Sequence, residues 1–472
     1  MLLHFVNRGK ELEILKDRCA SGKAELIPIY GRRRVGKTEL IKHFVNDKPH
    51  FYFLAKKKRL ADEMERFRLR ASETMNIFIP EIKTWEGIFE YILKSGKERL
   101  VVIIDEFPFW IEKDASIISD FQHLWDEFLK NKDIVLILCG SYVSIMENDV
   151  LGYKSPLYGR RTAQIEVDRL GFWEFVKFFP KWKLEEIIMA YGALDGIPFY
   201  IEKFDPNKSF LENIKNNFWK SGSVLNREAE FLLSQELREV EVYLSIMRSV
   251  FEGASKLNEI ATKSHVEITN INKYIKVLID LKFISIESPV LVSRPKRKNF
   301  VYKIADNFFN FWLSYVYPFK DDIEINEIEH LKTFFQKDYS RYMGFVFENV
   351  CKQAIPRLKI PVELTKTGRW WGHTKALNPE SGVLERKEIE IDLVCLDENK
   401  KEALFVECKW SDLKEREARK VLEELKEKSK FVEWERKKEY FGLIGKKILG
   451  KDNLRKDGFY VWDLEDFEKL LK

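Results

Sequence analysis

The chain has 472 residues, of which 45% are hydrophobic and 33% are charged, and its formal net charge at pH 7 is +5. These proportions are ordinary for a globular protein, and the length favours about three domains. The sequence contains no apolar run of about 18 residues, which excludes the pattern of a membrane-spanning helix, and no signal-peptide pattern, so we expect a cytoplasmic protein. The mild positive charge permits a nucleic-acid partner without requiring one.

The cysteines and histidines do not follow the pattern of a disulfide framework or a zinc site. The five cysteines are odd in number and scattered, mostly within apolar runs, and the seven histidines lack ligand spacing. We therefore expect reduced, buried cysteines.

Residues 31–38 (GRRRVGKT) match the phosphate-binding motif G-x-x-x-x-G-K-[ST]. The apolar run 26–30 predicts a strand before the motif, and residues 39–45 favour a helix after it, which is the context that the motif requires. Backbone N–H groups and the start of that helix can face phosphate oxygens, while Lys37 can reach the β- and γ-phosphates and Thr38 can hold Mg²⁺. We therefore expect a nucleoside triphosphate to contact Gly31, Arg32, Arg33, Arg34, Val35, Gly36, Lys37 and Thr38.

A second strand-like run, LVVIIDE at residues 100–106, ends in two carboxylates. A continuous apolar run is typical of a buried parallel strand, and open α/β sheets bind ligands at the carboxyl ends of their strands. Asp105 would complete the Mg²⁺ shell, and Glu106 would orient and deprotonate the attacking water. The alternative is a capped strand end without a catalytic role.

Three further candidates are less specific. Ser141, after the expected strand 133–138, could sense the γ-phosphate or could belong to a plain Gly-Ser turn. Arg160 and Arg161 could act as arginine fingers, within the chain or from a neighbouring copy, or could be an ordinary surface pair. The three arginines inside the phosphate loop could bind phosphate or contact a neighbouring subunit, so a homo-oligomer is one expectation.

Arg8 with Glu11, the loop GRRRVGKT, the strand LVVIIDE, the stretch LYGRR and the Gly196-x-Pro198 turn together resemble the archaeal ATPase family, within the STAND and AAA-like P-loop ATPases. The resemblance implies an α/β P-loop NTPase domain with a parallel sheet and a helical lid over residues 1–235. It also implies ATP and Mg²⁺ as ligands, with Arg8 and Pro198 beside the adenine.

Residues 236–318 show the pattern of a winged helix–turn–helix. The expected elements are three helices and two strands, at residues 236–251, 257–263, 269–282, 283–288 and 300–304. The recognition face would expose Thr269, Asn270, Asn272, Lys273 and Lys276, and the wing would present Arg294, Lys296, Arg297 and Lys298. These cations favour contact with DNA phosphates, but winged helices in P-loop ATPases also serve as lids or protein contacts.

Residues 319–472 begin with an acidic stretch, 321–329, that we expect to be a linker, and continue with a helix that contains Glu348. Strand patterns follow at 362–365, 369–372, 388–394, 403–410 and 440–445, and a helical pattern at 413–428. Strict alternation places Glu388, Glu390 and Asp392 on one face of their strand. Glu407 and Lys409 share a face of the next strand.

A helix with Glu348, a strand with Asp392, a hairpin to Glu407-x-Lys409 and a further helix resemble the PD-(D/E)XK nuclease core, specifically the C-terminal domain of unknown function in this ATPase family. The resemblance implies that Asp392 and Glu407 hold Mg²⁺ against a phosphodiester, that Lys409 positions or activates water, and that Glu348 completes the site. The usual proline before the aspartate is replaced by Ile391. A nuclease fold can also persist as a binding module, so cleavage and binding are alternatives.

The sequence therefore predicts an α/β protein of three modules, at residues 1–235, 236–318 and 319–472. ATP hydrolysis in the first module would control DNA binding or metal-dependent DNA cleavage by the others. The alternative is a nucleotide-gated DNA- or protein-binding switch whose nuclease-like domain is inactive.

Overall fold

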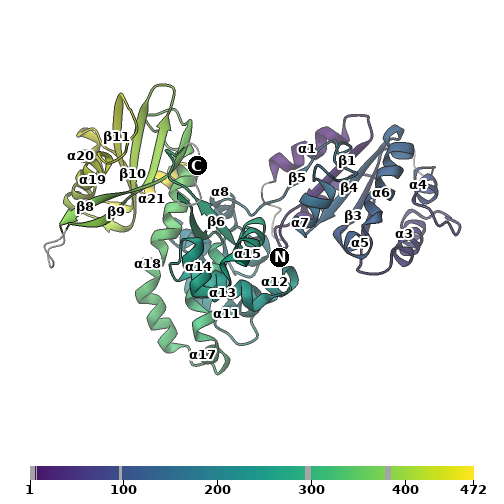
Figure 1. Ribbon diagram of the computed structural model, residues 1–472, viewed down its shortest axis with the longest axis horizontal. Helices are drawn as coiled ribbons and strands as arrows, with labels where there is room; N and C mark the ends of the chain where they lie inside the picture. The colour runs from purple at the N-terminus through teal and green to yellow at the C-terminus, as the bar shows by residue number, and fades with distance from the viewer. Residues whose placement is uncertain (1–5, 7, 95–97, 293–298, 378–383, 472) are drawn as a thin grey trace. The chain divides into compact units, whose positions relative to one another are not determined.

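The computed structural model describes residues 6, 8–94, 98–292, 299–377 and 384–471 (Figure 1). The chain packs as two compact units. The first unit consists of Met1–Leu170 and Ile197–Glu202, and the second unit consists of Gly171–Gly196 and Lys203–Lys472. The helical segment that the sequence places after the phosphate-loop sheet therefore packs largely with the second unit.

The first unit is built on a five-stranded parallel sheet with the order β2-β3-β4-β1-β5. Its strands are β1 (Glu25–Tyr30), β2 (His50–Leu54), β3 (Leu100–Asp105), β4 (Ile134–Gly140) and β5 (Ile165–Glu166). Figure 1 shows β1, β4 and β3 side by side at the centre of this unit. All residues of these three strands are buried, which explains their continuous apolar sequences. The predicted parallel sheet is confirmed.

Helices and an aromatic core surround this sheet. The main helices are α1 (Gly9–Cys19), α2 (Lys37–Val45), α3 (Leu60–Met75), α4 (Trp85–Lys94), α5 (Pro108–Lys113), α6 (Ser116–His123) and α10 (Pro198–Ile201). Phe67, Trp85 and Trp110 pack against one another, with Phe67 and Trp85 at a centroid distance of 5.4 Å. Glu63 of α3 is fully buried beside them and accepts hydrogen bonds from the Trp110 indole at 3.0 Å and from the Lys56 N–H at 2.8 Å. These bonds offset the cost of burying its carboxylate.

The second unit begins with a helical region. Its longer helices before the last sheet are α9 (Leu184–Leu194), α11 (Phe210–Asn217), α12 (Val224–Glu236), α13 (Val240–Phe251), α14 (Leu257–Ser264), α15 (Ile268–Asp280), α16 (Asn307–Tyr315) and α18 (Glu329–Ala354). Strands β6 (Ile284–Glu287) and β7 (Val301–Ile304) form an antiparallel pair after α15. The helix–helix–helix–hairpin order expected for residues 236–318 is therefore present.

The second unit also contains a mixed five-stranded sheet with the order β12-β11-β10-β9-β8. Its elements are β8 (Lys366–Leu377), β9 (Leu384–Asp397), β10 (Glu402–Leu413), α19 (Glu415–Ser429), β11 (Lys438–Ile448), α20 (Lys451–Lys456), β12 (Tyr460–Trp462) and α21 (Leu464–Lys469). Strands β8, β9 and β10 run antiparallel, whereas β10, β11 and β12 run parallel. The long helix α18 reaches this sheet (Figure 1), and Phe347 of α18 packs on Trp410 of β10.

Two expectations for this region are wrong. Residues 362–365 form bends and loop instead of a strand, and β8 begins only at Lys366. The expected acidic linker contains the short helix α17 (Lys320–Glu324), because Ile323 is buried while Asp321 and Asp322 occupy the first turn, where the helix dipole favours acids.

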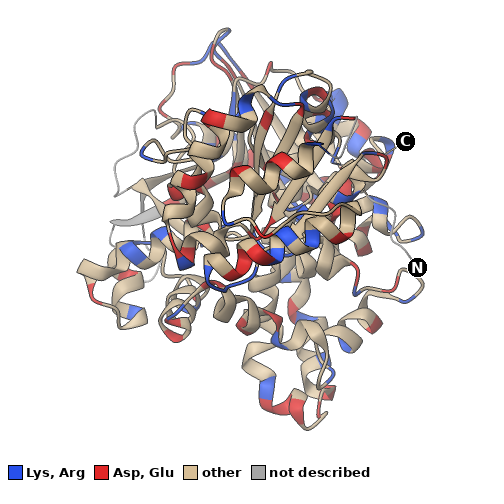
Figure 2. Cartoon of the chain, turned by 90° about the vertical axis from the view of Figure 1, so that its right-hand side faces the viewer, with Lys and Arg blue, Asp and Glu red and all other residues tan. Residues whose placement is uncertain are grey.

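Positive and negative side chains are interspersed along the helices (Figure 2). In α19, for example, Arg419 lies 3.3 Å from Glu415, and Lys426 lies 3.2 Å from Glu423. Exposed pairs of this kind each contribute only about 0.5 kcal/mol. Within the part of the chain that the structure describes, no helix is long and apolar enough to span a bilayer.

Candidate nucleotide site and a second charged cluster

The phosphate loop connects the carboxyl end of β1 to the start of α2, and two glycines shape it. Gly31 has φ +151°, and a Cβ atom at this position would lie 2.1 Å from the carbonyl oxygen of Val167. That close approach is fixed because the Val167 N–H donates to the Tyr30 carbonyl at 2.7 Å. Gly36 has φ +94° at the position before α2. Both positions therefore favour glycine for reasons of backbone geometry.

The side chain of Lys37 lies inside this loop and bonds to its backbone. This side chain is buried, and its ammonium donates to the carbonyls of Gly31 at 2.7 Å and Arg32 at 3.0 Å. The N-terminus of α2 starts at the same residue and has no side-chain cap, so its first N–H groups and the helix dipole favour an anion there. The loop thus combines a fixed ammonium with a helix N-terminus, which suits a phosphate chain.

Asp105, at the carboxyl end of β3, is held by donors from several elements. Its Oδ2 accepts from the Thr38 hydroxyl at 3.0 Å and from the Tyr52 hydroxyl at 2.5 Å, and its Oδ1 accepts from the Glu106 N–H at 2.9 Å. Burial, followed by the charge of Asp105, raises the pKa of Tyr52 and that of Cys139. The sequence assigns Thr38 and Asp105 to one expected Mg²⁺ site, and the structure brings their side chains into direct contact. The sequence gives no signal for Tyr52.

Glu106 and Ser141 are brought together as partners. The Ser141 hydroxyl donates to Oε1 of Glu106 at 2.7 Å, and its N–H lies 3.3 Å from Oε2. The Arg33 guanidinium lies 3.9 Å from Oε1 and stacks over Tyr142 at 5.1 Å. Glu106 itself has φ +55°, an uncommon value for a residue other than glycine. Ser141 thus contacts the carboxylate expected to act on water.

Arg8 and Pro198 both lie beside the loop. Arg8 donates to the Val35 carbonyl at 2.7 Å and pairs with Glu11 at 3.2 Å. A Cβ atom on Gly36 would lie 3.7 Å from Cγ of Pro198. The Arg34 guanidinium lies 4.0 Å above the ring of Phe199, the residue after Pro198, so the returning segment Ile197–Glu202 is attached to the loop.

Arg160 and Arg161 are engaged locally. Arg160 makes a two-point ion pair with Asp126, with Nη2 at 2.6 Å, and also donates to the Pro156 carbonyl at 2.6 Å. Arg161 donates to the Leu151 carbonyl at 2.9 Å and stacks over Tyr158 at 4.9 Å. Within the chain, these contacts are those of ordinary structural arginines. A role of either arginine as a finger toward a second copy stays a prediction.

The donor set of this site fits ATP with Mg²⁺. Magnesium usually retains several waters and takes one or two protein oxygens together with substrate phosphates. The hydroxyl of Thr38 and the carboxylate of Asp105 provide oxygens of this kind beside the loop. Among the described residues, no three or more His, Cys, Asp or Glu side chains form a group that could hold a metal ion by themselves.

The first unit has a parallel sheet, a glycine loop with a buried lysine after β1, and a carboxylate at the end of β3, which is separated from β1 by β4 alone. These features define a P-loop ATPase fold. A family model described as an ATPase domain predominantly from Archaea matches residues 5–204, and one described as "Archaea bacterial proteins of unknown function" matches residues 312–421. The chain belongs to the archaeal ATPase family that combines these two regions.

Individual relatives agree with this assignment. An uncharacterized protein of Methanocaldococcus jannaschii is 37% identical over 469 residues, which cover 98% of this chain and 100% of that protein. An uncharacterized ATP-binding protein of the same organism is 55% identical over 47 residues, or 10% of this chain and 80% of that protein. A Walker-type ATPase of Pyrococcus abyssi superposes with a TM-score of 0.50 at 19% identity, over 66% of this chain and 96% of that chain, which shows a shared fold.

The second unit holds a separate charged cluster where the sequence predicted one. Lys409 of β10 lies 2.7 Å from Oε2 of Glu407 and 3.7 Å from Oδ2 of Asp392 on the neighbouring strand β9. Oδ2 of Asp392 also accepts from the Cys408 N–H at 2.8 Å. Lys428 of α19 donates to the other oxygen of Glu407 at 2.7 Å, a partner that the sequence did not indicate.

The pKa values of the acids in this cluster are shifted in different directions. Burial, followed by the charge of Glu407, raises the pKa of Asp392 to about 7. Burial also raises the pKa of Glu348 on α18, against the nearby cations Arg369, Lys303 and Lys409. For Glu407 burial is outweighed by Lys409 and Lys428, which lower its pKa. The predicted residues Glu348, Asp392, Glu407 and Lys409 therefore do form one electrostatic cluster, as perturbed functional sites do.

This cluster continues to the β6–β7 hairpin. Arg369 of β8 pairs with Glu390 and lies 3.8 Å from Glu287 of β6. Lys303 of β7 lies 2.9 Å from the same Glu287 oxygen. In addition, the Val290 N–H after β6 donates to the Arg369 carbonyl at 2.9 Å. The hairpin is thus joined to the sheet beside Glu348 by ion pairs and by a backbone bond.

The expected recognition face of α15 is exposed. Its apolar residues Ile271, Ile275 and Leu278 are buried, whereas the predicted contacts are exposed: Thr269, Asn270, Asn272, Lys273 and Lys276. The four cations expected in the wing, Arg294, Lys296, Arg297 and Lys298, lie outside the described residues.

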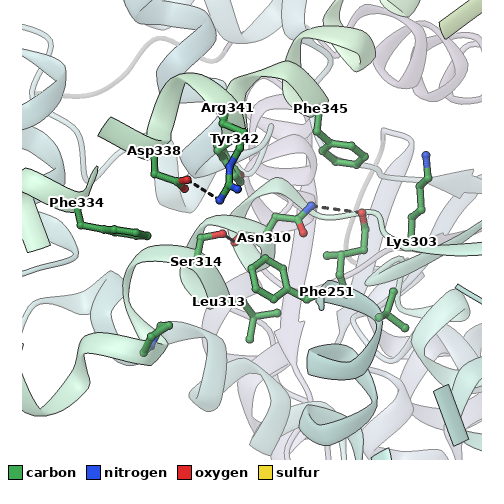
Figure 3. A pocket seen from close by; sticks show the side chains of 13 residues that line it. Phe251, Lys303, Asn310, Leu313, Ser314, Phe334, Asp338, Arg341, Tyr342 and Phe345 are labelled. Carbon is green, nitrogen blue, oxygen red and sulfur yellow. Dashed lines mark hydrogen bonds and ion pairs between the residues drawn. The ribbon is translucent and has the colours of Figure 1, made fainter. Parts of the chain in front are cut away.

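A cavity of about 550 Å³ lies between α13, α16 and α18 of the second unit (Figure 3). Its walls are mainly apolar, and its polar side chains bond to the protein itself. Arg341 pairs with Asp338 at 2.6 Å, Ser314 donates to the Asn310 carbonyl at 2.7 Å, and Asn310 donates to the Ile304 carbonyl at 3.4 Å. We assign no ligand to it.

Proposed function

We propose that the first unit binds and hydrolyses Mg²⁺-ATP, and that its nucleotide state controls DNA binding or metal-dependent DNA cleavage by the second unit. The observation that supports hydrolysis best is the convergence of Lys37, Thr38, Asp105 and Glu106 at the carboxyl ends of β1 and β3. Nucleotide binding alone requires the loop, whereas a glutamate beside the Mg²⁺-binding pair suits activation of water.

Each residue has a distinct part in the proposed reaction. Lys37 would exchange its two carbonyl partners for β- and γ-phosphate oxygens, and Thr38 with Asp105 would hold the cation. Bound Mg²⁺ supplies charge stabilisation to the transferring phosphoryl group. Glu106 would orient the attacking water and accept its proton, with Ser141 fixing the direction of its carboxylate. Arg8 and Pro198 would border the adenine, and Arg160 or Arg161 of a second copy would stabilise the transferring phosphate.

The ATPase proposal is tested by removing the loop ammonium. Lys37→Ala should abolish nucleotide binding or hydrolysis, measured by isothermal titration and phosphate release. Lys42→Ala is the matched control, because Lys42 is on the same helix but is exposed and pairs with Glu39 at 2.9 Å. Hydrolysis retained in Lys37→Ala would refute the proposed site.

For the second unit we propose a winged helix at residues 236–318 and a PD-(D/E)XK-like domain at residues 319–472. Exposure of Asn270, Asn272, Lys273 and Lys276 on α15 supports DNA contact by that helix. Asp392 and Glu407 would hold a divalent cation, Lys409 would position water, and Glu348 would complete the set. The raised pKa of Asp392 next to a cation-paired Glu407 supports a functional cluster.

A DNA-binding switch without cleavage is the second candidate. It is favoured by the contacts of Glu407, whose two oxygens are each bound by a lysine, so that its charge is balanced without a metal ion. A carboxylate in this arrangement can be purely structural.

One experiment separates the two candidates. The full chain is incubated with plasmid and Mg²⁺ or Mn²⁺, with and without ATP, beside Glu407→Ala and the control Asp412→Ala, an exposed acid of the same strand. Nicking by wild type and control but not by Glu407→Ala would support cleavage. Equal nicking by all three, or none, would refute it. In that case, reduced DNA affinity and a smaller salt slope after neutralising the basic residues 294–298 would support the switch.

A further inference from the structure

Tyr52 contacts the Asp105 carboxylate, although neither the loop motif nor the strand motif contains it. It lies on the edge strand β2, which pairs in parallel with β3 so that Tyr52 is opposite Ile103 and Leu54 is opposite Asp105. Its neighbours Phe51 and Phe53 are buried in the aromatic core, whereas Tyr52 points to the other face of the sheet and is half-buried. From there its hydroxyl reaches Oδ2 of Asp105 at 2.5 Å.

Two hydroxyls therefore converge on one carboxylate oxygen. Thr38 donates to the same Oδ2 at 3.0 Å, while the other oxygen, Oδ1, takes the Glu106 N–H at 2.9 Å. Asp105 is only 4% exposed, so its orientation is decided by these donors and not by bulk water. The Tyr52 bond restrains rotation of the carboxylate about its last torsion, because it fixes the oxygen that also faces Thr38.

We infer that Tyr52 is a positioning residue for the Mg²⁺ site, acting through Asp105. The inference rests on the proposed Mg²⁺-ATP function. Thr38 can offer an oxygen lone pair to a cation while its hydroxyl donates a hydrogen bond to Asp105, and Tyr52 holds Asp105 in the orientation that accepts this bond. Partners that orient metal-binding groups in this way commonly change metal affinity by about 10–100-fold when they are removed.

Tyr52→Phe removes the hydroxyl and keeps the ring. The measured quantity is the gain in affinity for a slowly hydrolysed ATP analogue when Mg²⁺ is added, obtained by titrating the full chain with and without the cation. We expect this gain to fall about tenfold or more in Tyr52→Phe, with unchanged affinity in the absence of Mg²⁺. Tyr91→Phe, at an exposed position on α4, is the matched control and should keep the wild-type gain.

The outcomes distinguish the inference from the function on which it rests. If wild type gains no affinity from Mg²⁺, the proposed Mg²⁺-dependent function fails and the inference fails with it. If wild type shows the gain and Tyr52→Phe shows the same gain, the function stands and the positioning role is refuted. A loss of affinity that is equal with and without Mg²⁺ would indicate a packing role only, and would also refute it.

Discussion

Asp392→Asn should make the second unit more stable at neutral and higher pH. The wild-type carboxylate is buried near Glu407 and Glu348. Burial and the charges of these two acids raise its pKa to about 7 from an ordinary 3.8. Asparagine has nearly the same shape, carries no charge, and can still accept the Cys408 N–H that now bonds to Oδ2 at 2.8 Å. The variant thus removes a repulsive buried charge without opening a cavity.

The sign follows from proton linkage. Between pH 3.8 and about 7 the folded protein retains a proton on Asp392 that the unfolded chain has released, so the free energy of unfolding decreases as pH rises through this window. The difference between the two pKa values corresponds to roughly 4 kcal/mol at the upper end. This difference is already net of the attraction to Lys409, 3.7 Å away, which lowers the pKa of Asp392. We expect the variant to be more stable by up to about 4 kcal/mol at pH 8 and close to wild type near pH 4.

The assay is hydrogen exchange of the β9 and β10 amides in metal-free buffer across this pH range, corrected for intrinsic exchange rates, because it reports local opening free energies in a multi-domain chain. Asp397→Asn, at the end of the same strand, is the control of opposite sign. The Asp397 carboxylate accepts the Lys400 N–H at 2.9 Å and the Asn399 N–H at 3.1 Å, and these bonds lower its pKa. Replacing this carboxylate should therefore lower the stability of the second unit at pH 8. If Asp392→Asn is no more stable than wild type at pH 8, or if the stability difference does not change with pH, the raised pKa of Asp392 is refuted as the cause.

Three further predictions concern single contacts. Gly31→Ala should cost about 3 kcal/mol in urea denaturation of the first unit and abolish nucleotide binding, because its Cβ would lie 2.1 Å from the Val167 oxygen; unchanged affinity would contradict the loop geometry. Glu106→Gln should retain nucleotide binding while phosphate release slows by about 100-fold or more, and normal turnover would exclude Glu106 as the base. Arg369→Gln should destabilise the second unit by about 3 kcal/mol, since three acids lose their shared cation, whereas Arg419→Gln in the surface ion pairs of α19 should leave its stability nearly unchanged.

The sheet of the first unit was predictable because its strands β1, β3 and β4 are buried along their whole length. Such strands must be apolar throughout, and the runs before Gly31 and before Asp105 therefore stand out from the rest of the sequence. The phosphate loop was predictable for a related reason, since its backbone admits glycine at fixed positions. In both cases the residues that determine the local structure are contiguous in the sequence.

Residues missed by the sequence analysis act through contacts between distant segments. Tyr52 meets Asp105 only because β2 and β3 are neighbours, and Lys428 meets Glu407 only because the C-terminal end of α19 lies beside β10. A tyrosine on an edge strand or a lysine on an amphipathic helix is common, so neither gives a local signal. Arg369 is similar, since its partners come from β6 and β9.

The two carboxylate sites of this protein differ in the charge of their donors, and this difference bears on how each would take a metal ion. Asp105 is bound by hydroxyls and a backbone N–H, which orient the carboxylate and leave its charge for a cation. Glu407 is bound by two ammonium groups that already balance its charge. A divalent ion at Glu407 must compete with Lys409 and Lys428, a cost that the first site does not impose. Metal-dependent cleavage, as proposed, would therefore require the ion to displace at least one lysine from Glu407.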